Sequence, residues 1–198
     1  MAADSFDNKG SVRALFVDFK NAYNIVSHNI LLTKLKNFNI SHCLLKWFAS
    51  YLFHRCQRVR VGSQVSSWMT LCGSMCQGSR FGPLSFIVMI DDLRANCEVR
   101  IFVDDTILSE LITPSSYPSD MTDYLSPLLT WTASNDMQLN TSKTKEMILG
   151  HIDSTSNPSL STPVGPIQRV TTFKLLGLHL DAGLSWTTHD KQVNNCTF

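Results

Sequence analysis

Apolar positions along the chain change their spacing several times, which predicts strands alternating with helices. A compact apolar run over Val12–Phe19, closing at Asp18, is typical of a buried strand. Ser27 and Ser41 stand before two stretches with apolar residues at helical spacing, and each serine could cap the helix that follows it. The chain is therefore expected to open with one strand and two helices.

The middle and the end of the chain favour hairpins. Arg58–Val61 alternates in polarity, Gly62-Ser63 predicts a turn, and Val65–Leu71 returns as a second strand. A tight hairpin is expected where two β-rich runs are joined by Asp104-Asp105. The remaining expected elements are helices at Gly82–Leu93 and Met121–Met137, a strand at Glu146–Leu149 and a hairpin at Phe173–Leu180.

This mixture of helices, strands and hairpins predicts the α+β class. Two polar stretches interrupt it. Thr113–Ser119 is expected to be a loop, and Asp153–Pro166, rich in Ser, Thr, Pro and Gly, a linker or long connection. The second stretch divides the chain into a larger part, residues 1–152, and a smaller part, residues 153–198.

Composition limits the class of protein. With 198 residues, 43% hydrophobic and 17% charged, the chain can bury a core, which excludes a disordered or fibrous protein. The longest apolar run, Leu84–Ile90, is too short to cross a bilayer, and the polar N-terminal residues contain no signal-peptide core. We therefore expect an intracellular protein of the nucleus or cytoplasm, without membrane contact.

The charge balance limits how the chain could bind nucleic acid, and the cysteine spacing indicates the state of its thiols. The 17 Lys and Arg residues nearly balance the 16 Asp and Glu residues, so the chain has no overall basic field. Any binding of nucleic acid must then depend on a local groove. The six cysteines lack CxxC pairs and zinc-site spacing, and we expect them to be reduced, mostly structural thiols.

Acidic residues at strand ends are the chemically informative feature. Asp18 closes one apolar run, and Asp104-Asp105 joins two others. Carboxylates crowded at such ends repel one another and lose hydration, so they need a counter-charge. Mg²⁺ supplies one, because it prefers oxygen ligands. The alternative for Asp104-Asp105 is an ordinary hairpin turn, in which Asp is common.

Five segments, in chain order, resemble the reverse transcriptase family, in particular the polymerase domain of non-LTR (LINE-like, jockey-type) retrotransposons: LFVDFKNAY, QGSRFGPLSF, IFVDDTIL, WTASNDMQLNTSKTKEMILG and VTTFKLLGLHLDAGLSW. The resemblance extends over nearly the whole chain. It implies a palm-type polymerase fold, an antiparallel sheet with helices packed on one face, in which fingers and thumb are largely missing. Residues 1–152 would be the palm with partial fingers, and residues 153–198 a linker and primer-grip-like hairpin, truncated before the thumb.

The resemblance also implies an RNA-directed DNA polymerase site. Asp18 resembles the first-block aspartate and Asp104 the first of the third-block pair. Together they would hold two Mg²⁺ ions, or Mn²⁺ instead, with Asp105 adjacent and more peripheral. The main-chain carbonyl of Phe19 is expected near a metal. Lys143, in the fourth block, would protonate the leaving pyrophosphate, unless it is only a solvated surface lysine.

The resemblance names an RNA template, a DNA primer and dNTPs as partners. Tyr23 stands five residues after Asp18, where the family has an aromatic residue that blocks the ribose 2′-hydroxyl. A flat ring under the sugar would leave no volume for the extra oxygen. The alternative for Tyr23 is packing in the core.

Further contacts with template, nucleotide and primer are implied in two other segments. Gln77, Gly78 and Ser79 resemble the second block, which approaches the template and the incoming nucleotide; they could equally form the loop that enters the next helix. Leu176 and Gly177 lie in the segment that resembles the primer grip. Two arginines of the alternating strand, Arg58 and Arg60, are candidates for phosphate contact or only solubilise the surface.

Departures from the family pattern leave a second function open. Ser74-Met75-Cys76 opens the second block where Gly-x-Pro is usual, Asn24 replaces a common Asp, and Val103 replaces a smaller Ala or a Met. Together with the missing fingers, they favour as alternative a catalytically deficient retrotransposon remnant that at most binds nucleic acid or protein. An unrelated receiver domain would also cluster aspartates, but it needs a parallel sheet of βα units rather than hairpins.

Overall fold

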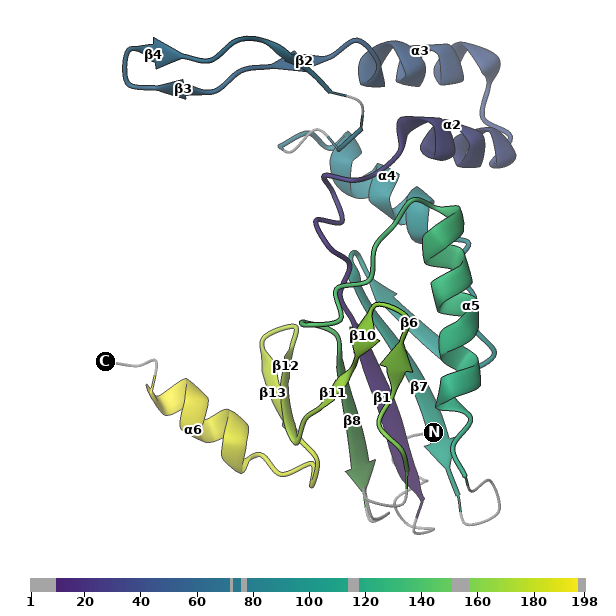
Figure 1. Cartoon of the computed structure of the whole chain (residues 1–198), viewed down its shortest axis with the longest axis vertical. Helices are drawn as coiled ribbons and strands as arrows, with labels where there is room; N and C mark the ends of the chain where they lie inside the picture. Colours follow the sequence, from purple (N-terminus) through teal and green to yellow (C-terminus); the bar gives the residue numbers. More distant parts are fainter. Residues whose placement is uncertain (1–9, 72, 76–77, 114–117, 151–156, 196–198) are drawn as a thin grey trace. The chain divides into compact units, whose positions relative to one another are not determined.

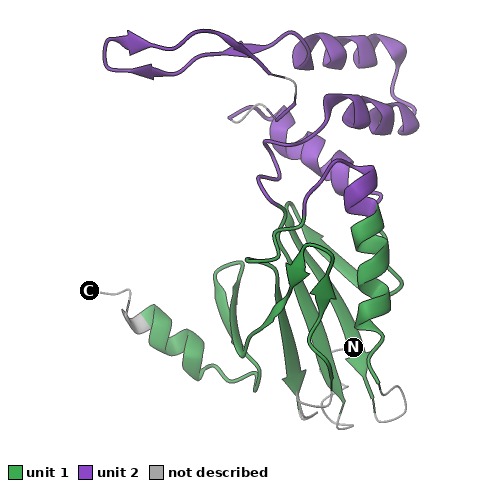
Figure 2. Ribbon diagram, in the orientation of Figure 1, with its two compact units in different colours: residues 1–19, 94–130, 139–198 green, residues 20–93, 131–138 purple. Residues whose placement is uncertain are grey.

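The computed structural model describes residues 10–71, 73–75, 78–113, 118–150 and 157–195. The chain forms two compact units (Figure 2), and each is described by itself. Unit 1 comprises residues 1–19, 94–130 and 139–198, and unit 2 comprises residues 20–93 and 131–138. The sequence-based assignment of residues 1–152 to a palm with partial fingers, and of residues 153–198 to a linker and primer-grip-like hairpin, stays a prediction.

Unit 1 is built around a five-stranded sheet in the order β11-β8-β1-β7-β6 (Figure 1). Its central strand β1 pairs antiparallel with both β7 and β8. The elements of unit 1 are β1 (Ser11–Val17), β6 (Glu98–Phe102), β7 (Asp105–Ile112), α5 (Met121–Ser134, which continues into unit 2), β8 (Lys145–Gly150), β9 (Ser161–Thr162), β10 (Gly165–Pro166), β11 (Gln168–Arg169), β12 (Thr172–Leu175), β13 (Leu178–Asp181) and α6 (Thr187–Asn195).

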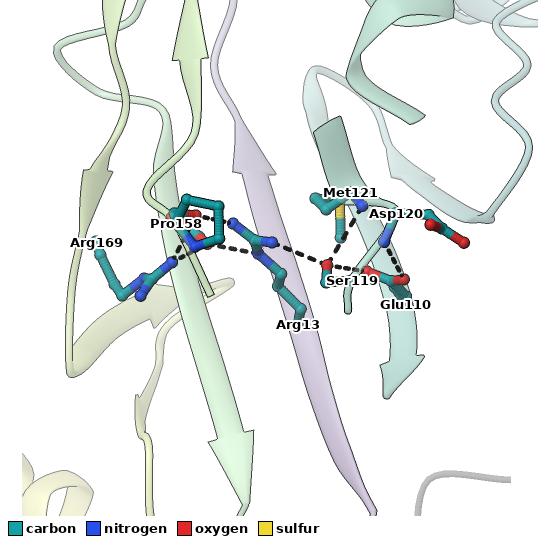
Figure 3. A network of polar contacts seen from close by, with 8 residues as sticks. Arg13, Glu110, Ser119, Asp120, Met121, Pro158 and Arg169 are labelled. Atoms are coloured by element: carbon teal, nitrogen blue, oxygen red, sulfur yellow. Dashed lines mark hydrogen bonds and ion pairs between the residues drawn. The ribbon is translucent and has the colours of Figure 1, made fainter. Parts of the chain in front are cut away.

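A buried ion pair lies on one face of this sheet. Arg13 and Glu146 are 1% and 0% exposed, and the Nε of Arg13 donates to Oε1 of Glu146 at 2.6 Å. The same guanidinium donates to the Ser119 hydroxyl at 2.8 Å and to the Pro158 carbonyl at 2.7 Å. Arg169 donates to the same Glu146 oxygen. Figure 3 labels Arg13, Ser119, Pro158 and Arg169 of this network. The network thus ties three strands, β1, β8 and β11, to two connecting segments.

The opposite face is apolar and is covered by the β12–β13 hairpin. Ala14, Phe16 and Met147 are buried there, and the rings of Phe16 and Phe173 stack with centroids 4.1 Å apart. Because side chains alternate along β1, Arg13 and Phe16 point to opposite faces. One face of the sheet therefore packs through the ion-pair network of Arg13, and the other packs against the β12–β13 hairpin.

Unit 2 contains three helices and two short ladders. Its elements are α2 (His28–Asn37), α3 (His42–Leu52), β2 (Cys56–Gln57), β3 (Arg60–Val61), β4 (Gln64–Val65), β5 (Met69–Thr70) and α4 (Phe81–Ile90). A polar contact ties the helices together, since the ammonium of Lys34 and the indole N–H of Trp131 both donate to Oδ1 of Asp92, at 2.5 and 2.7 Å. Burial lowers the pKa of Lys34.

Three expectations from the sequence need correction. Val103 and Asp104, not Asp104 and Asp105, form the turn between β6 and β7, because Asp105 already pairs with Phe102. Ser27 precedes α2 without a capping hydrogen bond, whereas Ser41 accepts one from Leu44. The stretch expected to be a linker or long connection contains the β9–β10 hairpin at its residues 161–166. The loop expected at 113–119 lies mostly outside the described residues.

The α+β class is confirmed, with a sheet that is antiparallel except for the parallel pairing of β11 with β8. In the described part of the chain, no helix is both long and apolar enough to cross a membrane.

We expect Glu146→Gln to lower the stability of the fold, because it leaves the buried charge of Arg13 without its counter-ion. Breaking one side of a buried pair costs about 3–5 kcal/mol. Urea unfolding followed by circular dichroism measures the effect. The matched control is Glu98→Gln, which breaks the exposed pair with Arg100 and should leave the midpoint nearly unchanged. Equal midpoints for both variants would contradict the importance of the buried pair.

Candidate active site

The turn between β6 and β7 exposes two carboxylates in succession. Val103 has a φ of 58°, which is unusual and strained for a β-branched residue. Asp104 completes the turn, and Asp105 begins β7; both are exposed.

The register of β1 against β7 brings Asp18 next to this turn. Val17, the last residue of β1, pairs with Thr106, and Asp18 follows directly, on the sheet face of Phe16. A small cavity of about 60 Å³ is lined by both Asp18 and Asp105, with Lys143 and the β12 residues Phe173 and Leu175 as further walls. Two carboxylates far apart in the sequence, those of Asp18 and Asp105, therefore line one cavity.

The electrostatics of this cavity are unfavourable without a cation. Burial raises the pKa of Asp105, and the nearby negative charges of Asp104 and Asp18 raise it further. Like-charged neighbours and lost hydration both disfavour the ionised form. The site thus holds one carboxylate, that of Asp105, whose ionised form a nearby positive charge would favour.

A divalent cation fits this donor set, although the described residues contain no group of three or more His, Cys, Asp and Glu side chains that could hold a metal by themselves. Mg²⁺ typically takes one or two protein carboxylates and completes its shell with water and substrate phosphates. Asp18 and Asp105, which line the cavity, meet that requirement. Asp104, in the adjacent turn, is exposed and is not among the residues that line this cavity. Which aspartate of the pair is the more peripheral at a metal stays a prediction.

Main-chain contacts of the fourth block hold Asp18 in place. The carbonyl of Asp18 accepts a hydrogen bond from the N–H of Asn140 at 2.9 Å, and its own N–H donates to the hydroxyl of Thr144 at 3.2 Å. Between them, Lys143 is exposed and its side chain lines the cavity. Sequence analysis missed Thr144, which is fully buried, because a lone threonine carries no chemical signal.

The neighbouring Phe19 is buried and forms an isolated antiparallel bridge with Leu139. A role of its carbonyl at a metal stays a prediction. Leu176 and Gly177 form the exposed turn of the β12–β13 hairpin. Both have positive φ, 47° and 89°, a conformation that suits Gly177 better than Leu176.

In unit 2, Tyr23 meets the second block. A cavity of about 480 Å³ is lined by Tyr23 together with Gly78, Ser79 and Arg80. The ring of Tyr23 stacks on Phe86, with centroids 4.9 Å apart. Tyr23 therefore both packs against Phe86 and lines the cavity, so the two interpretations of this residue do not exclude each other. Gln77 lies outside the described residues.

A set of short contacts holds the second-block loop against the segment after Tyr23. The N–H of Met75 donates to the Tyr23 carbonyl at 2.7 Å, and His28 donates through Nε2 to the Ser74 carbonyl at 2.8 Å. A Cβ on Gly73 would lie 2.9 Å from the Val26 carbonyl oxygen, so only glycine fits there. Sequence analysis missed His28 and Gly73, whose roles depend on a contact between segments far apart in the chain.

Comparison with known proteins agrees with this geometry. The family described as reverse transcriptase (RNA-dependent DNA polymerase) matches residues 2–180. The RNA-directed DNA polymerase from mobile element jockey of Drosophila melanogaster is 25% identical over 199 residues. That match covers 95% of this chain and 22% of the relative, so the chain spans about a fifth of the relative's length.

Solved telomerase structures share the fold. Telomerase from Candida tropicalis in complex with a TWJ fragment of telomeric RNA superposes with a TM-score of 0.61 and 12% identity, over 93% of this chain and 32% of that one. Telomerase from Candida albicans, also in complex with a TWJ fragment, gives 0.57 and 15%, over 90% and 32%. At such low sequence identity, the similarity shows a shared fold and nothing about function. By the family match over most of its length, the chain belongs to the reverse transcriptase family.

Proposed function

We propose that the chain is the polymerase module of an RNA-directed DNA polymerase, which transfers a dNMP to the 3′-hydroxyl of a DNA primer paired with an RNA template. The single observation that carries this proposal is the cavity shared by Asp18, Asp105 and Lys143. It joins two carboxylates and an amine from three separate segments, at the positions that resemble three blocks of the family.

Reverse transcriptases use divalent metal ions, and we propose two Mg²⁺ ions here. Asp18, Asp105 and the adjacent Asp104 would hold them. When bound, such ions neutralise phosphate charge and activate the primer hydroxyl for in-line attack on the α-phosphate. The raised pKa of Asp105 fits this role, because a nearby cation favours the ionised carboxylate.

The chain's own side chains have separate tasks in this proposal. Lys143 donates a proton to the leaving pyrophosphate. Phe173 and Leu175, which form apolar walls of the cavity, limit the access of water. Tyr23, in unit 2, excludes a ribose 2′-hydroxyl. Its proposed partners in placing template and nucleotide are Gly78 and Ser79, beside which it lines one cavity.

One observation favours the alternative, a catalytically deficient remnant that at most binds nucleic acid or protein. Ser74 has a φ of 81°, in the left-handed region, at the position where the family usually has glycine. A side chain in this conformation strains the second-block loop. Backbone strain at Ser74 would therefore be a local cause of the catalytic deficiency, and the substitution Ser74→Gly would remove it.

We expect primer extension on an RNA template in the presence of Mg²⁺, and a loss of at least about 100-fold in Asp105→Asn and Asp104→Ala, since several kcal/mol of charge stabilisation depend on them. The measurement is incorporation of labelled dNMP. Asp123→Asn, an exposed carboxylate in the first turn of α5, is the matched control and should extend normally. Incorporation of dNMP by both site variants would disprove the assignment of the site. If neither the unmodified protein nor any variant incorporates dNMP, the catalytically deficient remnant is favoured.

Metal binding has its own readout in thermal unfolding. Asp105→Asn should raise the midpoint without metal, because it removes a carboxylate whose raised pKa shows that its charge is disfavoured in the fold. The expected gain is about 0.2–1 kcal/mol, the scale of partly exposed charges. Added Mg²⁺ should stabilise the unmodified protein and have a smaller effect on the variant. Equal Mg²⁺ stabilisation of both proteins would argue against a metal at Asp105.

Ser74→Gly should stabilise unit 2 by about 1 kcal/mol, because glycine adopts a positive φ without steric cost. If the strained loop limits activity, the same change also raises primer extension. Ser74→Ala is the control, since it keeps the Cβ and therefore the strain. The two variants are compared by urea unfolding, and identical midpoints would show that the backbone at Ser74 stores no strain.

A further inference from the structure

The ribbon, residues 56–70 of unit 2, is an extended pair of strands without a core. All its residues are exposed. Gln57 pairs with Met69 and Arg60 with Val65, so the return strand has one extra residue between the two ladders. Such a bulge twists a two-stranded ribbon. An isolated ribbon of this kind is only marginally stable in water, which suggests that it has a partner.

Large apolar side chains are spread along the ribbon. An exposed apolar surface of this kind marks an interaction site on a protein. The side chains and their exposed fractions are Val61 74%, Met69 67%, Val59 64%, Trp68 62% and Val65 44%.

Charge identifies the class of partner. From Lys20 to Ile90 the sequence contains no Asp or Glu, although it contains eight of the chain's 17 Lys and Arg residues. Unit 2 as a whole has eight Lys and Arg against three Asp, whereas unit 1 has nine against thirteen Asp and Glu. The nearly neutral chain thus places its positive charge in the unit that contains the ribbon. A polyanion complements this unit.

One pair on the ribbon has the geometry of a stacking platform. The guanidinium of Arg58 lies over the Trp68 ring, 4.6 Å from its centroid. The two residues face each other across the strands, and the indole stays mostly exposed. Unpaired bases stack on such aromatic and guanidinium planes, while nearby arginines attract the phosphates. An acidic protein partner would explain the charge, but it would not need an exposed indole.

We propose that the ribbon binds single-stranded nucleic acid, with a base stacked at Trp68 and Arg58, and with Arg60 close to the phosphates. The inference rests on the proposed function, because it gives the polymerase module a surface for the unpaired strand. It concerns binding alone and requires neither metal nor dNTP.

The test is fluorescence anisotropy with a labelled, unstructured RNA of about 16 nucleotides, the upper range for one stacking groove. EDTA is present and dNTPs are omitted. Trp68→Ala should weaken binding about 10-fold or more, the effect of losing one base–aromatic stack, and Trp68→Phe should restore most of it. Arg58→Gln should also reduce the dependence of binding on salt, by about 0.7 in the log–log slope.

Two matched controls are available in unit 1. Trp186 is 66% exposed, similar to Trp68, and Trp186→Ala should bind RNA like the unmodified protein. Arg100 has a 71% exposed side chain, and Arg100→Gln should leave the salt dependence unchanged. Equal losses in the control variants, failure of Trp68→Phe to restore binding, or a change only in self-association by ultracentrifugation would each overturn the inference.

The proposed function can fail independently. The unmodified protein should bind the RNA in EDTA, because the binding assay needs neither metal nor catalysis. Normal binding together with no primer extension by any protein would overturn the polymerase proposal and leave the ribbon's role intact. Binding that ignores Trp68→Ala, with primer extension intact, would overturn the ribbon's role alone.

Discussion

The antiparallel pairing of β1 with β7 is the constraint on which the candidate site depends. It sets Val17 opposite Thr106 and so places Asp18 beside Asp105. A slip of one residue would move every side chain of β1 to the other face. The buried Arg13 makes such a slip costly, because its charge would leave Glu146 and enter the apolar layer around Phe16 and Phe173. The ion pair thus protects the geometry of a site that it does not touch.

The same alternation explains why the buried guanidinium of Arg13 does not neutralise the aspartates of the site. Arg13 faces one side of the sheet, where Glu146 already neutralises it, and Asp18 follows the opposite side. Lys143 is the lysine or arginine that lines the cavity of Asp18 and Asp105, and it is exposed. The buried charge of Arg13 is thus neutralised by Glu146, on the face of the sheet away from Asp18. A fold arranged in this way keeps these carboxylates available for cations.

Much of this arrangement follows from local sequence, and the rest follows from contacts that local sequence does not encode. The strand before Asp18, the hairpin after Cys97 and the primer-grip-like hairpin were predictable because period-2 runs flank short turns. The turn at Val103 was placed one residue late, since Asp is a better turn residue than valine and the register decided otherwise. Asn157 and Leu160, in the expected linker, are buried, because packing against distant segments overrides their polar neighbours.

The net charge of the chain hides an uneven distribution of charge along the sequence. A total of +1 excludes a basic field only if charges are mixed, and here they are sorted along the chain. Unit 1 has an excess of carboxylates and includes the aspartate cavity, which suits cations. Unit 2 has an excess of cations and exposes Trp68 and its arginines, which suits a polyanion. The proposed polymerase reaction would use both kinds of surface, one for metal ions and one for nucleic acid. Summed charge therefore says less about nucleic-acid binding than the longest stretch free of acidic residues.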